Sequence, residues 1–95
     1  MTLEDLFKAK KKILQIAEKY GASNVRIFGS VVRGSAEVSS DVDVLVDLAA
    51  GRTLLDHAGL IIELEKLLGC RVDVVTAKGL RSRIKHRIMK EAIPL

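Results

Sequence analysis

Two aspartates separated by one residue, Asp41 and Asp43, open a stretch of the chain that has the composition of a β-strand. Alternate side chains of a strand share a face, so both carboxylates should point the same way, with their Cα atoms roughly 6.5 Å apart at about 3.3 Å per residue. Two carboxylates at this spacing can jointly hold a divalent cation, and without one they repel each other. The pattern predicts that both residues are metal ligands.

A possible phosphate-binding turn precedes this pair. The strand-like segment 24–28 runs directly into Gly29-Ser30. A glycine has no Cβ, so backbone amides at such a corner can come close to an anion. Taken alone, a Gly-Ser pair is more often an ordinary turn.

A third aspartate, Asp73, lies inside a later apolar segment, between Val72 and Val74. An aspartate at the centre of a strand is hard to place unless its face of the sheet is polar or binds a metal. Asp47 also shares the face of Asp41 and Asp43. It could extend the acidic cluster or be a surface residue at the end of a strand.

Hydrophobic periodicity and turn residues predict the order helix, strand, strand, helix, strand, helix. The expected ranges are a helix over 2–20, strands over 24–28, 41–48 and 70–76, a helical turn over 31–33, a loop over 34–40, a helix over 53–68 and a final helix from residue 80. The simplest arrangement is an α+β fold with two layers, in which helices pack on one face of a small mixed sheet of three to four strands. We expect one domain over residues 1–95, and the sequence leaves open whether residues 93–95 form a last edge strand.

The composition excludes several classes of site. The single cysteine, Cys70, permits no internal disulfide and no cysteine-based zinc site, and we expect it to be a small buried residue. His57 and His86 are expected on helix surfaces. Three aromatic residues among 95 argue against a stacking platform for single-stranded nucleic acid, and the net charge of +4 does not by itself indicate DNA or RNA. No signal peptide or membrane helix is evident, so we expect a soluble cytoplasmic protein.

The combination of these motifs resembles the nucleotidyltransferase superfamily of the DNA polymerase β type. The shared features are Gly29-Ser30, then Asp41-Val42-Asp43, then an aspartate on a later strand, Asp73. The length of the chain resembles the minimal nucleotidyltransferases, or MNT proteins. In prokaryotes these are commonly antitoxins encoded beside a toxin with a HEPN domain.

The resemblance implies a role for each motif. Catalytic and metal-ligand roles would fall to Asp41, Asp43 and Asp73, which would bind two Mg²⁺ ions about 3.5–4 Å apart. Nucleotide-binding roles would fall to Gly29, Ser30, Arg33 and Ser40, with ATP as the substrate.

One residue departs from the family pattern. Many members read Gly-Ser-Arg-x-Arg-Gly, whereas this chain has Val31 at the first arginine position and keeps Arg33-Gly34. One cation directed at the phosphates is therefore missing, and we expect weaker nucleotide binding. The Ser-Asp-x-Asp motif is intact.

The resemblance implies an antitoxin that transfers AMP from ATP to a hydroxyl, on a tyrosine of a HEPN ribonuclease toxin with which it forms a hetero-oligomer. The alternative is a non-catalytic antitoxin that masks the toxin by stoichiometric binding, which Val31 favours. A weaker third hypothesis is transfer to a small molecule such as an aminoglycoside. The basic final helix is either a solvated surface or a docking surface for an acidic partner or RNA, although we do not expect direct nucleic-acid binding.

Overall fold

The computed structural model describes residues 1–34 and 41–95. Helices on one face of a mixed four-stranded sheet form the core, which confirms the expected α+β fold with two layers. The elements follow in the order α1 (Leu3–Lys8), α2 (Lys10–Lys19), β1 (Ala22–Phe28), α3 (Ser30–Arg33), β2 (Val42–Leu48), α4 (Leu54–Leu68), β3 (Val72–Thr76), α5 (Ser82–Glu91) and β4 (Ile93–Pro94).

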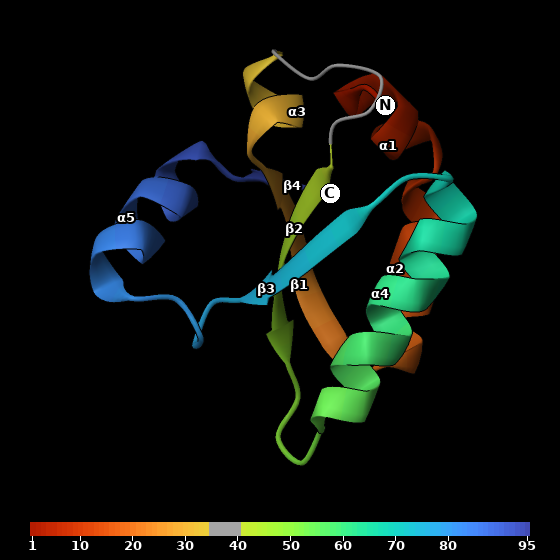
Figure 1. The fold of residues 1–95 in the computed structure, drawn as a ribbon, viewed down its shortest axis with the longest axis vertical. Helices are drawn as coiled ribbons and strands as arrows, with labels where there is room; N and C mark the ends of the chain where they lie inside the picture. Colours follow the sequence, from red (N-terminus) through yellow and green to blue (C-terminus); the bar gives the residue numbers. More distant parts are fainter. Residues whose placement is uncertain (35–40) are drawn as a thin grey trace.

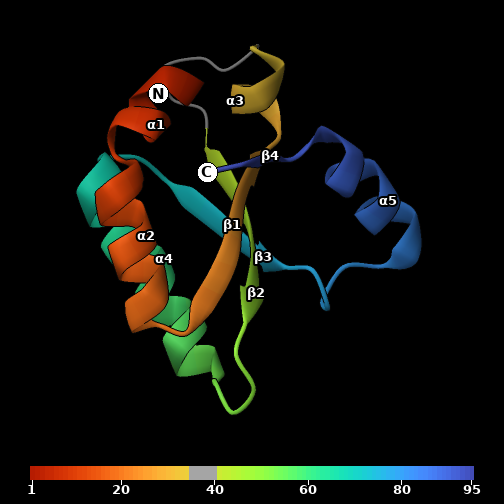
Figure 2. The ribbon, with the colours of Figure 1, turned by 180° about the vertical axis from the view of Figure 1, so that it is seen from behind.

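The sheet has the strand order β3-β2-β1-β4. β2 and β3 are parallel, and β1 pairs antiparallel with both β2 and β4. Figures 1 and 2 show α2 and α4 packed along one face of this sheet, whereas α5 stands on the opposite side. The sheet therefore has one face that belongs to the core and one face that is partly open.

The core lies between the sheet and the two long helices. Val42, Val44 and Val46 of β2 are buried against the helices, while Asp43 and Leu45 between them face the other side, where Leu45 is also buried. α2 and α4 contribute buried side chains at helical spacing, among them Ile13 and Leu60. This alternation explains why the aspartates of β2 are on the open face.

Two of the expected helix starts are confirmed in detail. Thr2 and Thr53 each form a capping box with an aspartate three residues later, in which the threonine backbone N–H donates to that carboxylate and the threonine hydroxyl accepts from a backbone N–H of the first turn. The expectation of one helix over residues 2–20 is wrong, because the helix is interrupted at Ala9, between α1 and α2. No glycine or proline accounts for this break.

β1 contains one extra residue relative to β2. Ser23 is opposite Asp47 and Arg26 is opposite Leu45, so two residues of β1 stand against one residue of β2. The backbone of Asn24 has a φ of 52°, in the left-handed region that asparagine tolerates. This is a β-bulge.

α4 also covers the outer edge of β3. The His57 ring N–H donates to the carbonyl of Val74 at 2.7 Å, and the Val72 N–H donates to Glu65 Oε2 at 3.0 Å. Two helix side chains therefore satisfy backbone groups that a further strand would otherwise satisfy. His57, expected as a surface residue, is part of this edge.

The packing predicts a clear contrast between two neighbouring positions of α4. Leu60 is fully buried, whereas Ile62 is 52 % exposed. We expect Leu60→Ala to lower the free energy of unfolding by about 2–5 kcal/mol, because it leaves a cavity. The control Ile62→Ala should cost less than about 1 kcal/mol. Urea denaturation of both variants measures the difference, and similar losses would contradict this core.

Candidate active site

The site is built on one row of residues that crosses three strands. Phe28 at the end of β1 pairs with Asp43 of β2, and Asp43 pairs with Asp73 of β3. Paired residues of neighbouring strands share a face and lie about 4.8 Å apart. The sheet therefore places the aspartates of two strands side by side, directly next to the Gly29 turn that follows Phe28.

Asp41 lies one residue before β2 and is exposed. Its carboxylate is 4.0 Å from Arg71 Nε. Within residues 1–34 and 41–95 the side chains do not form a closed set of three metal ligands. Asp41 would have to turn from Arg71 toward Asp43 to complete such a set.

The environment of Asp43 disfavours its negative charge. Burial is the main cause that raises the pKa of this carboxyl, and the charges of Asp73 and Asp41 raise it further. The buried ring of Phe28 on the neighbouring strand contributes to the loss of solvent. A divalent cation would relieve the mutual repulsion, and carboxylate oxygens are the ligands that Mg²⁺ prefers. The donor set therefore fits such a metal.

The turn at Gly29 has the close approach that a glycine allows. Its φ is +81°, and a Cβ at this position would overlap Asp43 Oδ2. The carboxylate of Asp43 thus lies directly against the backbone of the turn. Ser30 follows as the first residue of α3, and Arg33 is the last residue of that helix.

Val31 is 5 % exposed and belongs to the hydrophobic core. The residue that departs from the family pattern is therefore a packing residue here. Arg33, by contrast, is exposed and free of the core, as a residue that contacts phosphates would be. Ser40, also expected near the nucleotide, lies outside the described residues.

A cleft of about 350 Å³ lies over this turn. The sheet side contributes Phe28, Gly29, Arg33 and Asp43, and α5 contributes Ile84, Arg87, Ile88 and Glu91. The α5 residues were not expected at the site. Their spacing of three and four residues places them on one face of a helix, so periodicity could have identified the face, but not its neighbour.

Glu91 makes the most specific contact in this cleft. The Gly29 N–H donates to Glu91 Oε2 at 3.0 Å, and Arg33 Nη1 donates to Glu91 Oε1 at 2.6 Å. The hydrogen bond from Gly29 is the main cause that lowers the pKa of Glu91, and the hydrogen bond and charge of Arg33 add to it. Glu91 is therefore an anion held by two donors of the turn.

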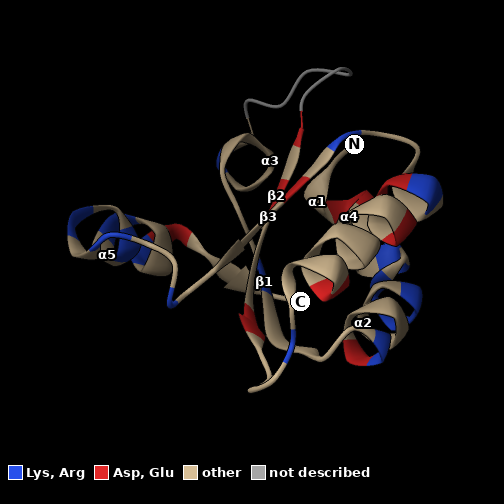
Figure 3. Cartoon of the chain, turned by 60° about the horizontal axis from the view of Figure 1, so that its bottom comes forward, with Lys and Arg blue, Asp and Glu red and all other residues tan. Residues whose placement is uncertain are grey.

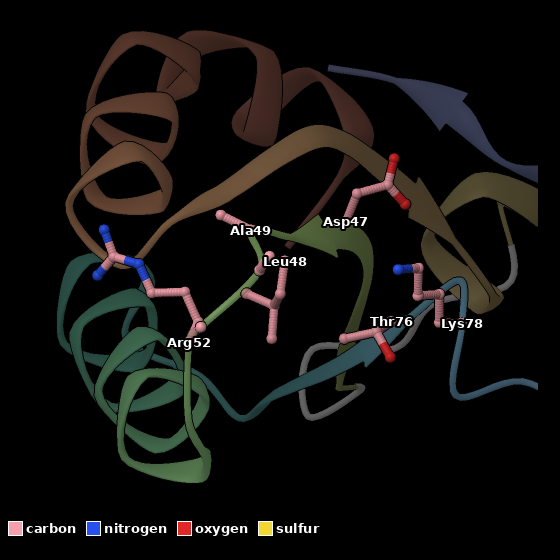
Figure 4. A pocket seen from close by; sticks show the side chains of 8 residues that line it. Asp47, Leu48, Ala49, Arg52, Thr76 and Lys78 are labelled. Carbon is pink, nitrogen blue, oxygen red and sulfur yellow. The ribbon is translucent and has the colours of Figure 1, made fainter.

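Asp47 does not join the acidic cluster. It lies four residues after Asp43, about 13 Å along the strand, and its Oδ1 is 3.2 Å from Nη2 of the buried Arg26. Figure 4 shows Asp47 at a second pocket of about 320 Å³, with Thr76 and Lys78 on its other side. Asp47 lies at the end of β2 that is remote from Asp43, and there it is the ion-pair partner of Arg26.

Basic residues are frequent on α5, whereas the acidic residues of the site lie on the sheet. In Figure 3 red positions of β2 and β3 lie close to α3, while blue Lys and Arg positions mark α5 and α2. No helix within the described ranges is long and apolar enough to cross a membrane.

Comparison with known proteins identifies the fold and the family. The sequence profile of the nucleotidyltransferase domain matches residues 9–95. The chain belongs to the nucleotidyltransferase family. This confirms the resemblance seen in the Gly-Ser and Asp-x-Asp motifs, and it confirms the expected class of enzyme.

Two curated relatives of this nucleotidyltransferase cover most of both chains. The protein adenylyltransferase MntA of Thermococcus cleftensis is 40% identical over 91 residues, which is 96% of this chain and 90% of the relative. A protein of Methanocaldococcus jannaschii, provisionally named a protein adenylyltransferase, is 42% identical over 84 residues, which is 88% of this chain and 90% of the relative.

Solved structures agree with the fold. One structure, provisionally described as a minimal nucleotidyltransferase, is 49% identical, has a TM-score of 0.89 and covers 100% of this chain and 97% of that chain. A toxin–antitoxin structure with AMP-PNP is 20% identical, with a TM-score of 0.77 over 90% of this chain and 70% of that chain. At this identity the second structure supports the fold alone.

Proposed function

We propose that this protein is a Mg²⁺-dependent protein adenylyltransferase that acts as an antitoxin. It transfers AMP from ATP to a tyrosine hydroxyl of a partner HEPN ribonuclease toxin and so neutralises it. The observation that carries the proposal is the pairing of Asp43 with Asp73 beside the Gly29 turn. The adenylyltransferase names of two relatives at 40% and 42% identity support the choice of AMP.

The carboxylates of Asp41, Asp43 and Asp73 would hold the metal. Bound there, Mg²⁺ supplies positive charge that stabilises the attacking and leaving oxygens of an in-line displacement. Asp43 is the central ligand because it lies between the other two and against the turn.

The residues of the turn would hold the triphosphate. The Gly29 N–H and the Arg33 guanidinium already bind an anion in this structure, the carboxylate of Glu91. Arg33 forms charge-assisted hydrogen bonds, which are stronger than those of neutral groups. We assign both to the β- and γ-phosphates, together with Ser30 and Ser40.

In the transfer step the acceptor oxygen bonds to the α-phosphorus as the bond from that phosphorus to the bridging oxygen breaks. Pyrophosphate leaves with the electron pair of that bond, and AMP remains on the acceptor. The acceptor hydroxyl gives its proton to a base, and we assign Asp73 because it is exposed next to Asp43.

The open side of the sheet suits a protein acceptor. The cleft between α5 and the turn opens beside the carboxylate row, and no described residue of α5 is buried. A tyrosine presented by a partner protein can reach such a surface. A setting that supplies ATP and keeps Cys70 reduced, the cytoplasm, fits this role.

One observation favours the alternative of a masking antitoxin that does not transfer AMP. Arg33 and Gly29 are already bound to Glu91, and Val31 replaces a possible second arginine. In that case the toxin would be neutralised by binding alone.

The test is to incubate the protein with its HEPN partner, Mg²⁺ and ATP labelled on the α-phosphate or on the γ-phosphate. We expect the α-label alone to appear on the toxin, the modified residue to be a tyrosine by mass spectrometry, and ribonuclease activity to fall in step. Omitting Mg²⁺ with a chelator should abolish labelling. Full neutralisation without ATP, with no label on the toxin, would instead establish masking.

A further inference from the structure

Glu91 is the last residue of α5, yet its side chain reaches the turn between β1 and α3. It contacts Gly29 and Arg33, at sequence separations of 62 and 58 residues. Each carboxylate oxygen accepts from a different donor, so the contact bridges the turn and the short helix. The Glu91 side chain is 23 % exposed, which leaves it open to exchange with a ligand from solution.

The two donors are the groups that the proposed function gives to the triphosphate. A carboxylate resembles one edge of a phosphate, with two oxygens that share a negative charge. The lowered pKa of Glu91 keeps that charge at neutral pH. Glu91 and a phosphate therefore cannot occupy these donors together.

α5 packs loosely against the rest of the protein. None of its residues is buried, and Ile84 and Met89 are 49 % and 44 % exposed. A further contact joins Arg26 Nη1 to Met89 Sδ at 3.1 Å, and β4, which begins two residues after Glu91, pairs with β1. The apolar side chains of α5 are only partly buried, so displacing this helix costs less than opening the core.

We propose that Glu91 is an internal anion that occupies the triphosphate site and that ATP displaces it. The displacement releases the last turn of α5 from the Gly29 turn. The inference rests on the proposed function, and it adds how that site is regulated. The measured affinity for ATP then reflects the difference in binding free energy between the phosphates and the Glu91 carboxylate at these donors. Release of α5 is coupled to nucleotide binding.

The first test is binding of Mg²⁺–ATP to Glu91→Gln by calorimetry. Removing the competing charge should tighten binding by about tenfold, from the free energy of one charge-assisted hydrogen bond. Glu91→Ala should tighten binding at least as much. The control Glu4→Gln also removes one negative charge, from an exposed pair with Lys8 on α1, and should leave binding unchanged.

Weaker or unchanged binding in both Glu91 variants would overturn the inference. Weaker binding would mean that Glu91 positions Arg33 for the nucleotide, and unchanged binding would mean that the two anions do not compete. Thermal melting shows whether each variant is folded at the temperature of the binding experiment. If one Glu91 variant is not folded, the other variant decides the test.

The second test is hydrogen exchange on the unmodified protein. Saturating Mg²⁺–ATP should protect the Gly29 amide and accelerate exchange of the last turn of α5. Exchange of α5 that is unchanged by ATP would overturn the inference.

The experiments distinguish a failure of the transferase assignment from a failure of the proposed displacement of Glu91. If ATP displaces Glu91 but no AMP reaches the toxin, the transferase assignment fails and the displacement stands. If AMP is transferred but the Glu91 variants bind ATP like the unmodified protein, the displacement fails and the transferase assignment stands.

Discussion

Asp43→Asn should reduce AMP transfer on the order of a thousand-fold, because it removes the central carboxylate of the metal site. Asparagine has the same shape but no charge. The neighbouring Phe28, Gly29 and Asp73 should keep their positions, so the loss should be in the transfer step. The measurement is the rate at which labelled AMP appears on the toxin.

The same substitution should not destabilise the protein without metal. Burial and the charges of Asp73 and Asp41 raise the pKa of Asp43, so its ionised form is less favourable in the folded state than in the unfolded state. Where the carboxyl is ionised, that difference lowers stability, and a neutral asparagine removes it. The melting temperature of Asp43→Asn in a chelator should therefore equal or exceed that of the unmodified protein.

Asp47→Asn is the matched control on the same strand and the same face. It should keep transfer while lowering the melting temperature, because the buried guanidinium of Arg26 loses its carboxylate partner. Transfer that survives Asp43→Asn, or that is lost equally in Asp47→Asn, would contradict the assignment of the site.

Gly29→Ala should also abolish transfer, through a different cause. At a φ of +81° an L-residue is strained, by about 1–3 kcal/mol, and the added methyl group would overlap Asp43 Oδ2. The carboxylate must move away from the turn. The variant should therefore lose both stability and transfer, with the loss of transfer being the larger.

Gly51→Ala separates strain from displacement. Gly51 has a φ of +86°, and an added Cβ there meets nothing within 4 Å. This variant should be destabilised by a similar amount, yet it should transfer AMP at the normal rate. Chemical denaturation and the labelling assay on both variants give the comparison, and normal transfer by Gly29→Ala would show that the turn is not part of the site.

The row of aspartates could be predicted because it depends on local rules. Strand alternation alone places Asp41 and Asp43 on one face, and the valines on both sides of Asp73 place it on the same face of its strand. The carboxylates of Asp43 and Asp73 meet only if β2 and β3 are neighbouring strands with these two residues in register, and the structure shows this pairing. The capping boxes can be predicted for the same reason, since each joins two residues that are three positions apart.

The contacts of α5 could not be predicted, because they depend on where a helix lies after the chain has folded. The sequence indicates an amphipathic helix, but it does not tell which face meets Gly29. The contact between Glu91 and the turn joins residues 62 positions apart, and no local pattern encodes it. The break at Ala9 cannot be predicted from the sequence, because Ala9 and the lysines on both sides of it favour a helix.

The bulge in β1 gives the protein one place where its length can change safely. Asn24 is the extra residue, and without it Val25 would pair with Val46 while Arg26, Ile27 and Phe28 kept their present partners. A deletion at Asn24 would therefore straighten the strand and leave Gly29 beside Asp43. A deletion of Ile27 would turn the site-bearing end of the strand over. Insertions and deletions in related chains should accordingly gather at this bulge and be absent from the three residues that follow Val25.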